Sequence, residues 1–493
     1  MSNIHTFQYF TNNNWHNPIA GNYFGSENPA DGKVWANIPN CDQLDINKAV
    51  SAAKAAFYEG PWGKMHASER GRLLRRIGDV ISKNADQLGK IETRDNGKLP
   101  NMIAPGLKEG QWQVDSWHYY AGMCDKFEGR LIPAESPNIH NYLKWEPFGV
   151  VAQILPWNSP IGTLICKLAP CLAAGNTVVL KPSEHSSAST LKLMEILIEA
   201  DLPPGVLNVV TGFGKTTGEP LLSHPDVRMI SFTGGTDGGK AIAAIAADQV
   251  KPVVMELGGK SPQIVFPDSD IELAVNGIIS GIFPAGGQSC ISGSRLLIHQ
   301  SIIEDFTTRL VEVARKAQVG DPNLPTTQIG PIANKTHYNR VLNFIESAKS
   351  TGHNLLLDGR SECRKEGYYI GPTIFSNVPN NSDLAQTEIF GPVASTEAWN
   401  DEDEVIQIAN DTKYGLAAGI WSADVARAMR LADRIEAGTV YINNYFNAAT
   451  QSPVGGFKQS GYGREGGWEG MRCFMQTKSV WLSTAPIQLD PFP

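Results

Sequence analysis

The sequence predicts an α/β fold of two or three domains, and three observations lead to this prediction. The chain has 493 residues, which at roughly 100–200 residues per domain is enough for two or three sizeable cores. From about residue 148, short runs of β-branched residues alternate with helical segments. A second series of such runs begins near residue 294. Strands that alternate with helices are typical of buried parallel sheets.

The first series contains five apolar runs, and each ends in glycine, proline or a polar residue. They are GVVAQILPW, NTVVLKPSE (176–184), VLNVVTG (206–212), MISFTGG (229–235) and PVVMELGG (252–259). A helix is expected at 186–200, before Pro203-Pro204-Gly205. Ligands of open parallel sheets bind outside the carboxyl ends of the strands, so we expect a ligand site where these runs end.

Further elements lie on both sides of this series. Leu73, Ile77 and Leu88 belong to an apolar stripe that predicts one helix over 66–95, ended by Asn96-Gly97. The second series predicts four strands and three helices. The strands are SRLLIHQ (294–300), GYYIGPTIF, PVASTEAW and GTVYINN, and the helices are 302–317, 403–410 and 424–436.

Two extended, partly alternating pieces fit neither series. They are NIHNYLKWE (138–146) and CFMQTKSVWLS (473–483). They form either an edge hairpin and a terminal strand packed on their own subunit, or strands that pair across a subunit boundary. Periodicity alone leaves both alternatives open.

The composition is that of an ordinary globular protein, with 42% hydrophobic and 19% charged residues. A net charge of -8, without basic runs, predicts no general nucleic-acid or membrane partner. The N-terminus has no signal-peptide pattern and no apolar run is long enough to span a bilayer, so a cytoplasmic location is expected. Seven widely spaced cysteines without a CxxC predict neither a disulfide framework nor a zinc or other metal site.

Two glycine-rich turns and a charged strand end are candidate cofactor contacts. FTGGTDGGK (232–240) and TGFGKTTG (211–218) each follow a strand, but neither is a GxGxxG or a Walker loop. Gly234 and Gly235 let the backbone approach a phosphate, although most such turns are only structural. Lys181 and Glu184 in KPSE could contact sugar hydroxyls, or form a solvated loop.

Cys290, Glu256 and Asn158 are the candidate catalytic residues. The loop GGQSCISG around Cys290 is too polar and glycine-rich for a buried inert cysteine, and so favours a nucleophile. Glu256 ends an apolar run, which suits a general base of raised pKa, or a paired structural glutamate. Asn158 in PWNSP could donate to an oxyanion, or cap a turn.

Together these segments resemble the NAD(P)-dependent aldehyde dehydrogenase superfamily over nearly the whole chain. The motifs are PWN (156–158), KPSE (181–184), FTG (232–234), ELGGKSP (256–262), GQSC (287–290), EIFGPV (388–393) and GGFKQSGYGRE (455–465). The resemblance implies that Cys290 is the nucleophile, Glu256 the general base and Asn158 an oxyanion donor. It also implies NAD as cofactor, which Glu184 favours over NADP, although some members with this glutamate accept both.

The resemblance extends to further site residues. The implied cofactor contacts are Ile154, Trp157, Lys181, Ser183, Glu184, Gly214, Phe232, Thr233, Gly234, Gly235, Leu257, Glu388 and Phe390. The implied substrate pocket contains Ser159, Thr163, Cys166, Ser289, Ile291 and Ala448. Several of these, with Pro284, replace aromatic residues that are common in the family, and Tyr445 and Phe446 restore part of an aromatic wall. A larger or functionalised aldehyde is therefore expected.

The family fold implies an NAD-binding domain of 1–124 and 148–258, and a catalytic domain of 259–461. It also implies a bridging element of 125–147 and 462–493, and a homodimer or homotetramer. Three alternatives remain beside aldehyde oxidation with water as acyl acceptor: a CoA-acylating dehydrogenase, a non-catalytic protein on this fold, and a cofactor-free thiol hydrolase. The intact Glu256 and Cys290 argue against the first two, and the βαβ half argues against the third.

Overall fold

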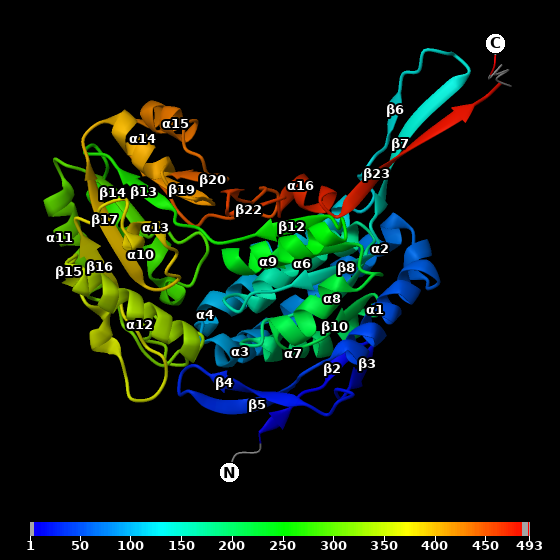
Figure 1. Cartoon of the computed structure of the whole chain (residues 1–493), viewed down its shortest axis with the longest axis horizontal. Coiled ribbons are helices and arrows are strands. Elements are labelled where there is room, and N and C mark those ends of the chain that lie inside the picture. The colour runs from blue at the N-terminus through cyan, green and yellow to red at the C-terminus, as the bar shows by residue number, and fades with distance from the viewer. Residues whose placement is uncertain (1–3, 486–491, 493) are drawn as a thin grey trace.

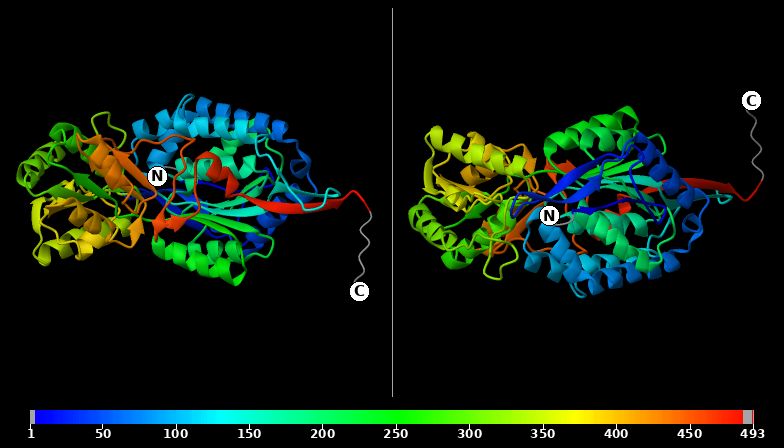
Figure 2. Two further views of the ribbon diagram at one scale, coloured as in Figure 1. Left: turned by 90° about the horizontal axis from the view of Figure 1, so that it is seen from above. Right: turned by 90° about the horizontal axis from the view of Figure 1, so that it is seen from below.

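Two large sheets and a three-stranded arm form the frame of the computed structural model, which describes residues 4–485 and 492 (Figure 1). The expected segments 1–124 and 462–493 therefore include residues 1–3, 486–491 and 493, which lie outside the described residues. The arm projects away from the body of the molecule and carries the C-terminal end of the chain (Figures 1 and 2).

The first sheet has eight strands, of which the middle five are parallel. Along the sheet these five are β12 (Val253–Glu256), β11 (Met229–Thr233), β8 (Val150–Ile154), β9 (Thr177–Lys181) and β10 (Leu207–Val209). Three antiparallel strands complete its edges: β22 (Gly461–Tyr462), β2 (Tyr9–Thr11) and β3 (Asn14–His16). Read from β10 to β12 and numbered by their order in the sequence, the parallel strands run 3-2-1-4-5. This is the order of doubly wound sheets, whose ligands bind between strands 1 and 4. Here that switch point lies between β8 and β11.

Helices from the N-terminal half cover this sheet (Figure 2). They include α1 (Gln43–Tyr58), α5 (Trp112–Met123), α6 (Pro160–Ala173), α7 (Ser187–Leu197) and α9 (Thr236–Asp248). The single helix predicted over 66–95 is wrong in one respect, because it is two helices, α2 (Ala67–Lys83) and α3 (Ala85–Asn96). The break is at Asn84, where the backbone leaves helical geometry and the N–H bonds back to Ile81 and Ser82.

The second sheet has seven strands. In order these are β15 (Asn354–Leu357), β16 (Thr373–Ser376), β17 (Val393–Trp399), β14 (Arg295–His299), β13 (Pro262–Val265), β19 (Ala417–Trp421) and β20 (Thr439–Ile442). All its pairings are parallel except that of β15 with β16. It packs with α10 (Ile271–Ile282), α11 (Ile303–Ala314), α12 (Lys335–Ser350), α14 (Glu402–Asn410) and α15 (Val425–Ala432). The strand expected in GYYIGPTIF is confirmed for its last three residues and continues to Ser376. The strand begins only after Gly371-Pro372, so the first part of the segment is not a strand.

The two extended pieces lie together in the arm. They form β7 (Ile139–Pro147) and β23 (Met475–Ser483), which pair antiparallel with each other along their whole length, with β6 (Arg130–Ile132) beside β7. This pairing occurs within one chain, and a contact of these strands across a subunit boundary stays a prediction.

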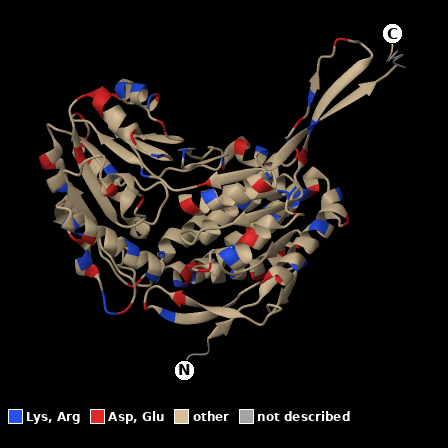
Figure 3. Cartoon of the chain, viewed as in Figure 1, with Lys and Arg blue, Asp and Glu red and all other residues tan. Residues whose placement is uncertain are grey.

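Charged side chains of both signs are distributed over both sheets and their helices (Figure 3). Among the described residues, no helix is long and apolar enough to cross a membrane.

Candidate active site

The candidate site begins at the carboxyl ends of the parallel strands of the eight-stranded sheet. Ile154 ends β8 and leads to Trp157 and Asn158, Thr233 ends β11, and Glu256 ends β12. Because the three strands are parallel neighbours, these ends share one edge of the sheet. Glu256 is only 7% exposed, and Asn158 is half-buried.

Cys290 reaches this edge from the other sheet, in the loop between α10 and β14. Three consecutive left-handed residues shape the loop: Ala285, Gly286 and Gly287, with φ of 54°, 64° and 70°. At Gly287 a Cβ would lie 2.2 Å from the carbonyl oxygen of Gly391, so only glycine allows this loop to approach the 388–391 segment so closely. Cys290 itself is half-buried.

The two groups of residues meet. The Asn158 Nδ2 donates to the carbonyl oxygen of Gln288, two residues before Cys290, at 3.0 Å. On the other side, a Cβ on Gly259 would lie 2.6 Å from the Cys290 carbonyl oxygen. The predicted amide, the turn after the predicted base and the predicted nucleophile are thus brought together, with one part of the site from each sheet.

Burial, together with the nearby carboxyls of Glu388 and Glu256, raises the pKa of the Cys290 thiol to about 12. The backbone N–H groups of Ile291 and of Cys290 itself act in the opposite direction, because they donate toward the sulfur. The thiol therefore carries its proton at neutral pH, and a base has to accept it when the sulfur attacks. The same two N–H groups would stabilise negative charge on the sulfur.

Burial raises the pKa of Glu256 well above its usual range, and the carboxylate of Glu465 adds to this effect. The charges of Lys167 and Arg464 oppose it. Lys167 is fully buried in α6, where its Nζ pairs with Glu465 and donates to the Ser231 hydroxyl at 3.1 Å. In addition, the buried Oε1 of Glu256 has no hydrogen-bond partner in the protein. An unpaired carboxyl oxygen beside a thiol is arranged to take up a proton.

Sequence reasoning missed Lys167 and Glu465, the buried pair beside Glu256. A signal was present, because Lys167 stands in the apolar run PIGTLICKLAP, where a charge is expensive without a partner. Glu465 closes the quoted motif GGFKQSGYGRE.

The predicted ribose contacts lie after β9. The Nζ of Lys181, which is 2% exposed, is 3.8 Å from the Glu184 carboxylate, and Ser183 is buried between them in sequence. The turn Gly214–Gly218 lies beside them, since a Cβ on Gly218 would lie 3.7 Å from the Lys181 side chain. Gly214, the first residue of that turn, has open space where a Cβ would be.

The predicted pyrophosphate turn joins β11 to α9. Phe232 is buried against Gly234, where a Cβ would lie 2.4 Å from its ring, and Gly235 has open space. Gly235 is also the N-cap of the 13-residue α9 and offers no side-chain cap to the first-turn N–H groups. The buried Thr233 hydroxyl has no partner. Uncapped N–H groups and a spare hydroxyl are what an anionic group requires.

The 388–390 segment closes the other side of the site. The Glu388 carboxylate accepts from the Gly259 N–H at 2.9 Å, and burial raises its pKa to about 7. Phe390 has a left-handed φ of 61°, and its ring meets Trp157 edge-on at 5.3 Å. The predicted contact Leu257 lies between these parts, and its N–H donates to the Ser460 carbonyl.

Two residues of α12 hold this segment, and sequence reasoning missed both. The His337 ring nitrogen Nε2 bonds with the Phe390 carbonyl oxygen at 2.6 Å, and its ring contacts Trp157 at 5.0 Å. Arg340 donates to the carbonyls of Glu388 and Ile389, at 2.7 and 3.3 Å. Neither residue lies in a motif, so nothing in the sequence pointed to them.

The predicted substrate-pocket residues separate into two groups. Ser159, Thr163 and Cys166 lie on α6 or at its N-terminus, and Ser289 and Ile291 flank Cys290; all five are half-buried. Ala448 is exposed and lies on the loop after β20. That loop reaches the site through a different residue, Tyr445, whose hydroxyl donates to the Ile291 carbonyl oxygen at 2.8 Å.

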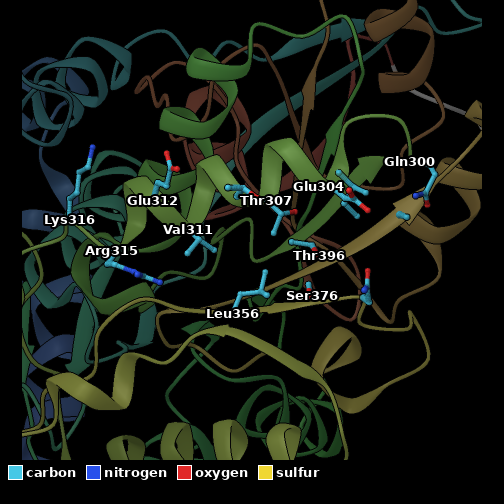
Figure 4. A pocket seen from close by; sticks show the side chains of 14 residues that line it. Gln300, Glu304, Thr307, Val311, Glu312, Arg315, Lys316, Leu356, Ser376 and Thr396 are labelled. Carbon is cyan, nitrogen blue, oxygen red and sulfur yellow. The ribbon is translucent and has the colours of Figure 1, made fainter.

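A separate hollow of about 870 Å³ lies between α11 and the strands β15 to β17 (Figure 4). It is lined by Thr307, Arg315, Leu356 and Thr396, among others. None of the predicted site residues lines it, so it is not part of the candidate active site.

The chain is similar to known proteins over almost its entire length. Residues 15–480 match the model of the aldehyde dehydrogenase family. An aldehyde dehydrogenase of Enchytraeus buchholzi is 42% identical over 477 residues, which is 96% of this chain and 95% of that protein. The (Z)-2-((N-methylformamido)methylene)-5-hydroxybutyrolactone dehydrogenase of Acinetobacter baylyi is 41% identical and covers 99% of both chains. Among solved structures, the NAD+ complex of an aldehyde dehydrogenase from Bacillus cereus has a TM-score of 0.94 at 37% identity, covering 98% of this chain and 97% of that one.

Proposed function

The chain belongs to the aldehyde dehydrogenase family and is an NAD-dependent aldehyde oxidoreductase, and we propose that Cys290, Glu256 and Asn158 carry out its chemistry. One observation carries this proposal. A thiol, a carboxyl of raised pKa and a side-chain amide converge at the junction of the two sheets, and nothing else in the candidate site combines these three groups. The product is the carboxylic acid.

In the first step the Cys290 sulfur attacks the aldehyde carbon and gives a thiohemiacetal whose oxygen is negatively charged. The thiol proton leaves as the C–S bond forms, and Glu256 accepts it, because burial makes its carboxylate an unusually strong base. Asn158 Nδ2 and the Cys290 backbone N–H donate to the oxyanion.

Hydrolysis of the thioester then regenerates the free Cys290 thiol. Loss of hydride from the tetrahedral carbon leaves a thioester on Cys290, and Glu256 releases to solvent the proton that it took from the thiol. As a carboxylate again, Glu256 removes a proton from water, which attacks the thioester carbon. The C–S bond breaks, the acid leaves, and the sulfur regains a proton. Burial is the main cause of the raised pKa of this base, and the largely buried Lys167–Glu465 pair adjusts it, because Glu465 raises the pKa and Lys167 lowers it.

The residues at the strand ends suit NAD. Lys181 and Glu184 are placed for the hydroxyls of the adenosine ribose, and Glu184 would repel a 2′-phosphate. The uncapped N-terminus of α9 and the unpartnered Thr233 hydroxyl suit the pyrophosphate. Glu388 and Phe390 would contact the nicotinamide half. When bound, NAD supplies the hydride acceptor that no protein side chain can provide.

A larger or functionalised aldehyde is proposed as the substrate. Ser159, Thr163 and Cys166 give α6 a small and partly polar face, where bulky side chains would narrow the path to Cys290. The Acinetobacter relative is named for a functionalised substrate, which agrees with such a path. The cytoplasmic location stays a prediction.

The domain division expected from the sequence is also proposed, with the arm of β6, β7 and β23 as the oligomerisation element. The arm exposes large apolar side chains: Leu131 is 74%, Trp481 67% and Leu482 52% exposed. Apolar surface of this kind on a projecting arm is characteristic of protein contacts, and a second copy of the chain is the proposed partner. Light scattering on the purified protein should show a dimer or a tetramer, and a monomer would refute this assignment.

Initial rates of NADH formation, measured with a panel of aldehydes with and without CoA, test the proposed chemistry. Cys290→Ala should abolish oxidation, whereas the same change at the exposed Cys363 should have no effect. Glu256→Gln should form the thioester, visible by mass spectrometry, and slow its hydrolysis by about 10²- to 10⁴-fold. Wild-type turnover in the Cys290 or Glu256 variant would show that the roles are wrongly assigned, and strict dependence on CoA would replace water as the acyl acceptor.

A further inference from the structure

Solvent reaches α6 along one face only. Of its residues Pro160–Ala173, all are buried except Thr163 and Cys166, which continue a half-buried stripe that begins at the N-cap residue Ser159. Ser159 directly follows Asn158, whose amide bonds to the Cys290 loop. The stripe is thus the part of α6 that is open to solvent, and it begins next to the residue that contacts the Cys290 loop.

A lysine lies at the start of this stripe. The helix α3 ends at Asn96, and the left-handed Gly97 turns the chain so that Lys98 faces α6. Asn96 secures the turn, because its Nδ2 donates to the carbonyls of Trp157 and Asn158 at 3.3 and 3.4 Å, and its Oδ1 accepts from the Lys98 N–H. The Lys98 Nζ donates to the Ser159 Oγ at 3.3 Å.

The Ser159 hydroxyl is turned toward Lys98 instead of capping its own helix. An N-cap serine normally accepts from a first-turn N–H, but Ser159 makes no such bond. The buried carboxylate of Glu92 takes that place and accepts from the Ile161 N–H at 3.2 Å. Burial is the main cause of the raised pKa of Glu92, and the positive charge of Lys98 and the Ile161 N–H act in the opposite direction.

Among the described residues, the Lys98 ammonium forms no close ion pair in front of α6, although its charge also acts on the buried carboxyl of Glu92. Within residues 4–485 and 492, Lys98 has no carboxylate within 4.0 Å. An ammonium group has three N–H donors, and the structure gives Lys98 one acceptor on this side, Ser159. The Gln113 amide stands beside them, since its Nε2 and the Ser159 Oγ lie 2.7 and 2.8 Å from where a Cβ of Gly162 would be.

We propose that Lys98, with the Ser159 hydroxyl, binds a carboxylate on the aldehyde substrate, so that the enzyme prefers aldehydes that carry an acid group. The inference rests on the proposed role of Cys290 and names the substrate class of that same site. A half-buried ammonium forms a strong charge-assisted hydrogen bond with a carboxylate, and the N-terminus of α6 adds favourable dipole energy. A neutral substrate of the same shape gains neither contribution.

The test compares succinic semialdehyde with its methyl ester, which keeps the aldehyde and the chain but removes the charge. Wild-type protein should show a kcat/KM that is roughly 10- to 100-fold higher for the acid, the range of one hydrogen bond to a charged group. Lys98→Met should raise the KM of the acid by a similar factor and change that of the ester far less. Lys98→Arg should retain most of the preference.

Lys90→Met is the matched control, because it removes the same charge from an exposed position on α3, the helix that precedes Lys98. It should leave the preference intact. Equal effects of Lys98→Met on both substrates, or a wild-type enzyme that turns over the ester as well as the acid, would overturn the assignment of Lys98 while leaving aldehyde oxidation in place. Absence of NADH with both substrates would also overturn the assignment of Lys98, and only absence of NADH across the whole aldehyde panel would refute the proposed function as well.

Discussion

Gly259→Ala is expected to displace the nucleophile without changing any reacting group. The added Cβ would lie 2.6 Å from the Cys290 carbonyl oxygen, and ordinary contacts begin at about 3.4 Å, so the loop has to retreat by about 0.8 Å. A misplacement of about 1 Å lowers an enzymatic rate by up to about 100-fold. We therefore expect kcat to fall by roughly 30- to 100-fold, with a much smaller change in the thermal unfolding temperature.

The assay measures kcat from NADH formation, together with the rate at which iodoacetamide alkylates Cys290. Gly122→Ala is the control, because its Cβ would meet only the tip of Arg75, at 4.0 Å. It should match the wild type in both measurements. If Gly259→Ala folds normally and keeps kcat within twofold of the wild type, then the turn after Glu256 does not hold the Cys290 loop in place, and the reasoning from this contact is refuted.

Three further predictions concern charge and assembly. Lys167→Met leaves Glu465 in a largely buried position without its cation, so the free energy of unfolding measured in urea should fall by about 3–5 kcal/mol. The same change removes a positive charge near Glu256, so the acid limb of the pH–rate profile should move to higher pH. Burial raises the pKa of Asp95 to about 7, so between about pH 4 and 7 the folded chain holds this proton while the unfolded chain releases it. The stability that this group contributes is complete below about pH 4 and is lost as the pH rises to about 7. Asp95→Asn should therefore reduce the pH dependence of the free energy of unfolding measured in urea. Trp481→Glu should shift light scattering toward the monomer, and an unchanged mass would exclude this side chain from the interface.

The sequence predicted most of the cofactor-side framework, and the reason is geometric. Lys181, Thr233 and Glu256 each follow a β-branched run, and parallel strands place their carboxyl ends at one edge, so runs far apart in sequence could be assigned to one site. The convergence of Cys290 with these ends needed the family resemblance, because the cysteine loop belongs to the other sheet.

Other features could not be predicted because they depend on contacts distant in sequence. Nothing near His337 indicates that its ring will reach the Phe390 carbonyl, and nothing near Lys98 indicates that it will face Ser159. The apolar stripe over 66–95 is continuous across Asn84, so periodicity alone concealed the break between α2 and α3. The mutual pairing of β7 and β23 depended on register, which the pattern of each piece leaves open.

The division of the catalytic groups between the two sheets has a consequence for how the enzyme fails. Of the three residues proposed for the chemistry, Asn158 and Glu256 lie at strand ends of one sheet and Cys290 lies in a loop before a strand of the other, so neither half of the molecule contains the complete proposed set. Catalytic activity therefore requires that the two halves of the molecule pack correctly against each other. A low denaturant concentration that loosens the contact between the two halves, while both sheets keep their helices, should abolish activity. Circular dichroism should show loss of secondary structure only at a higher concentration.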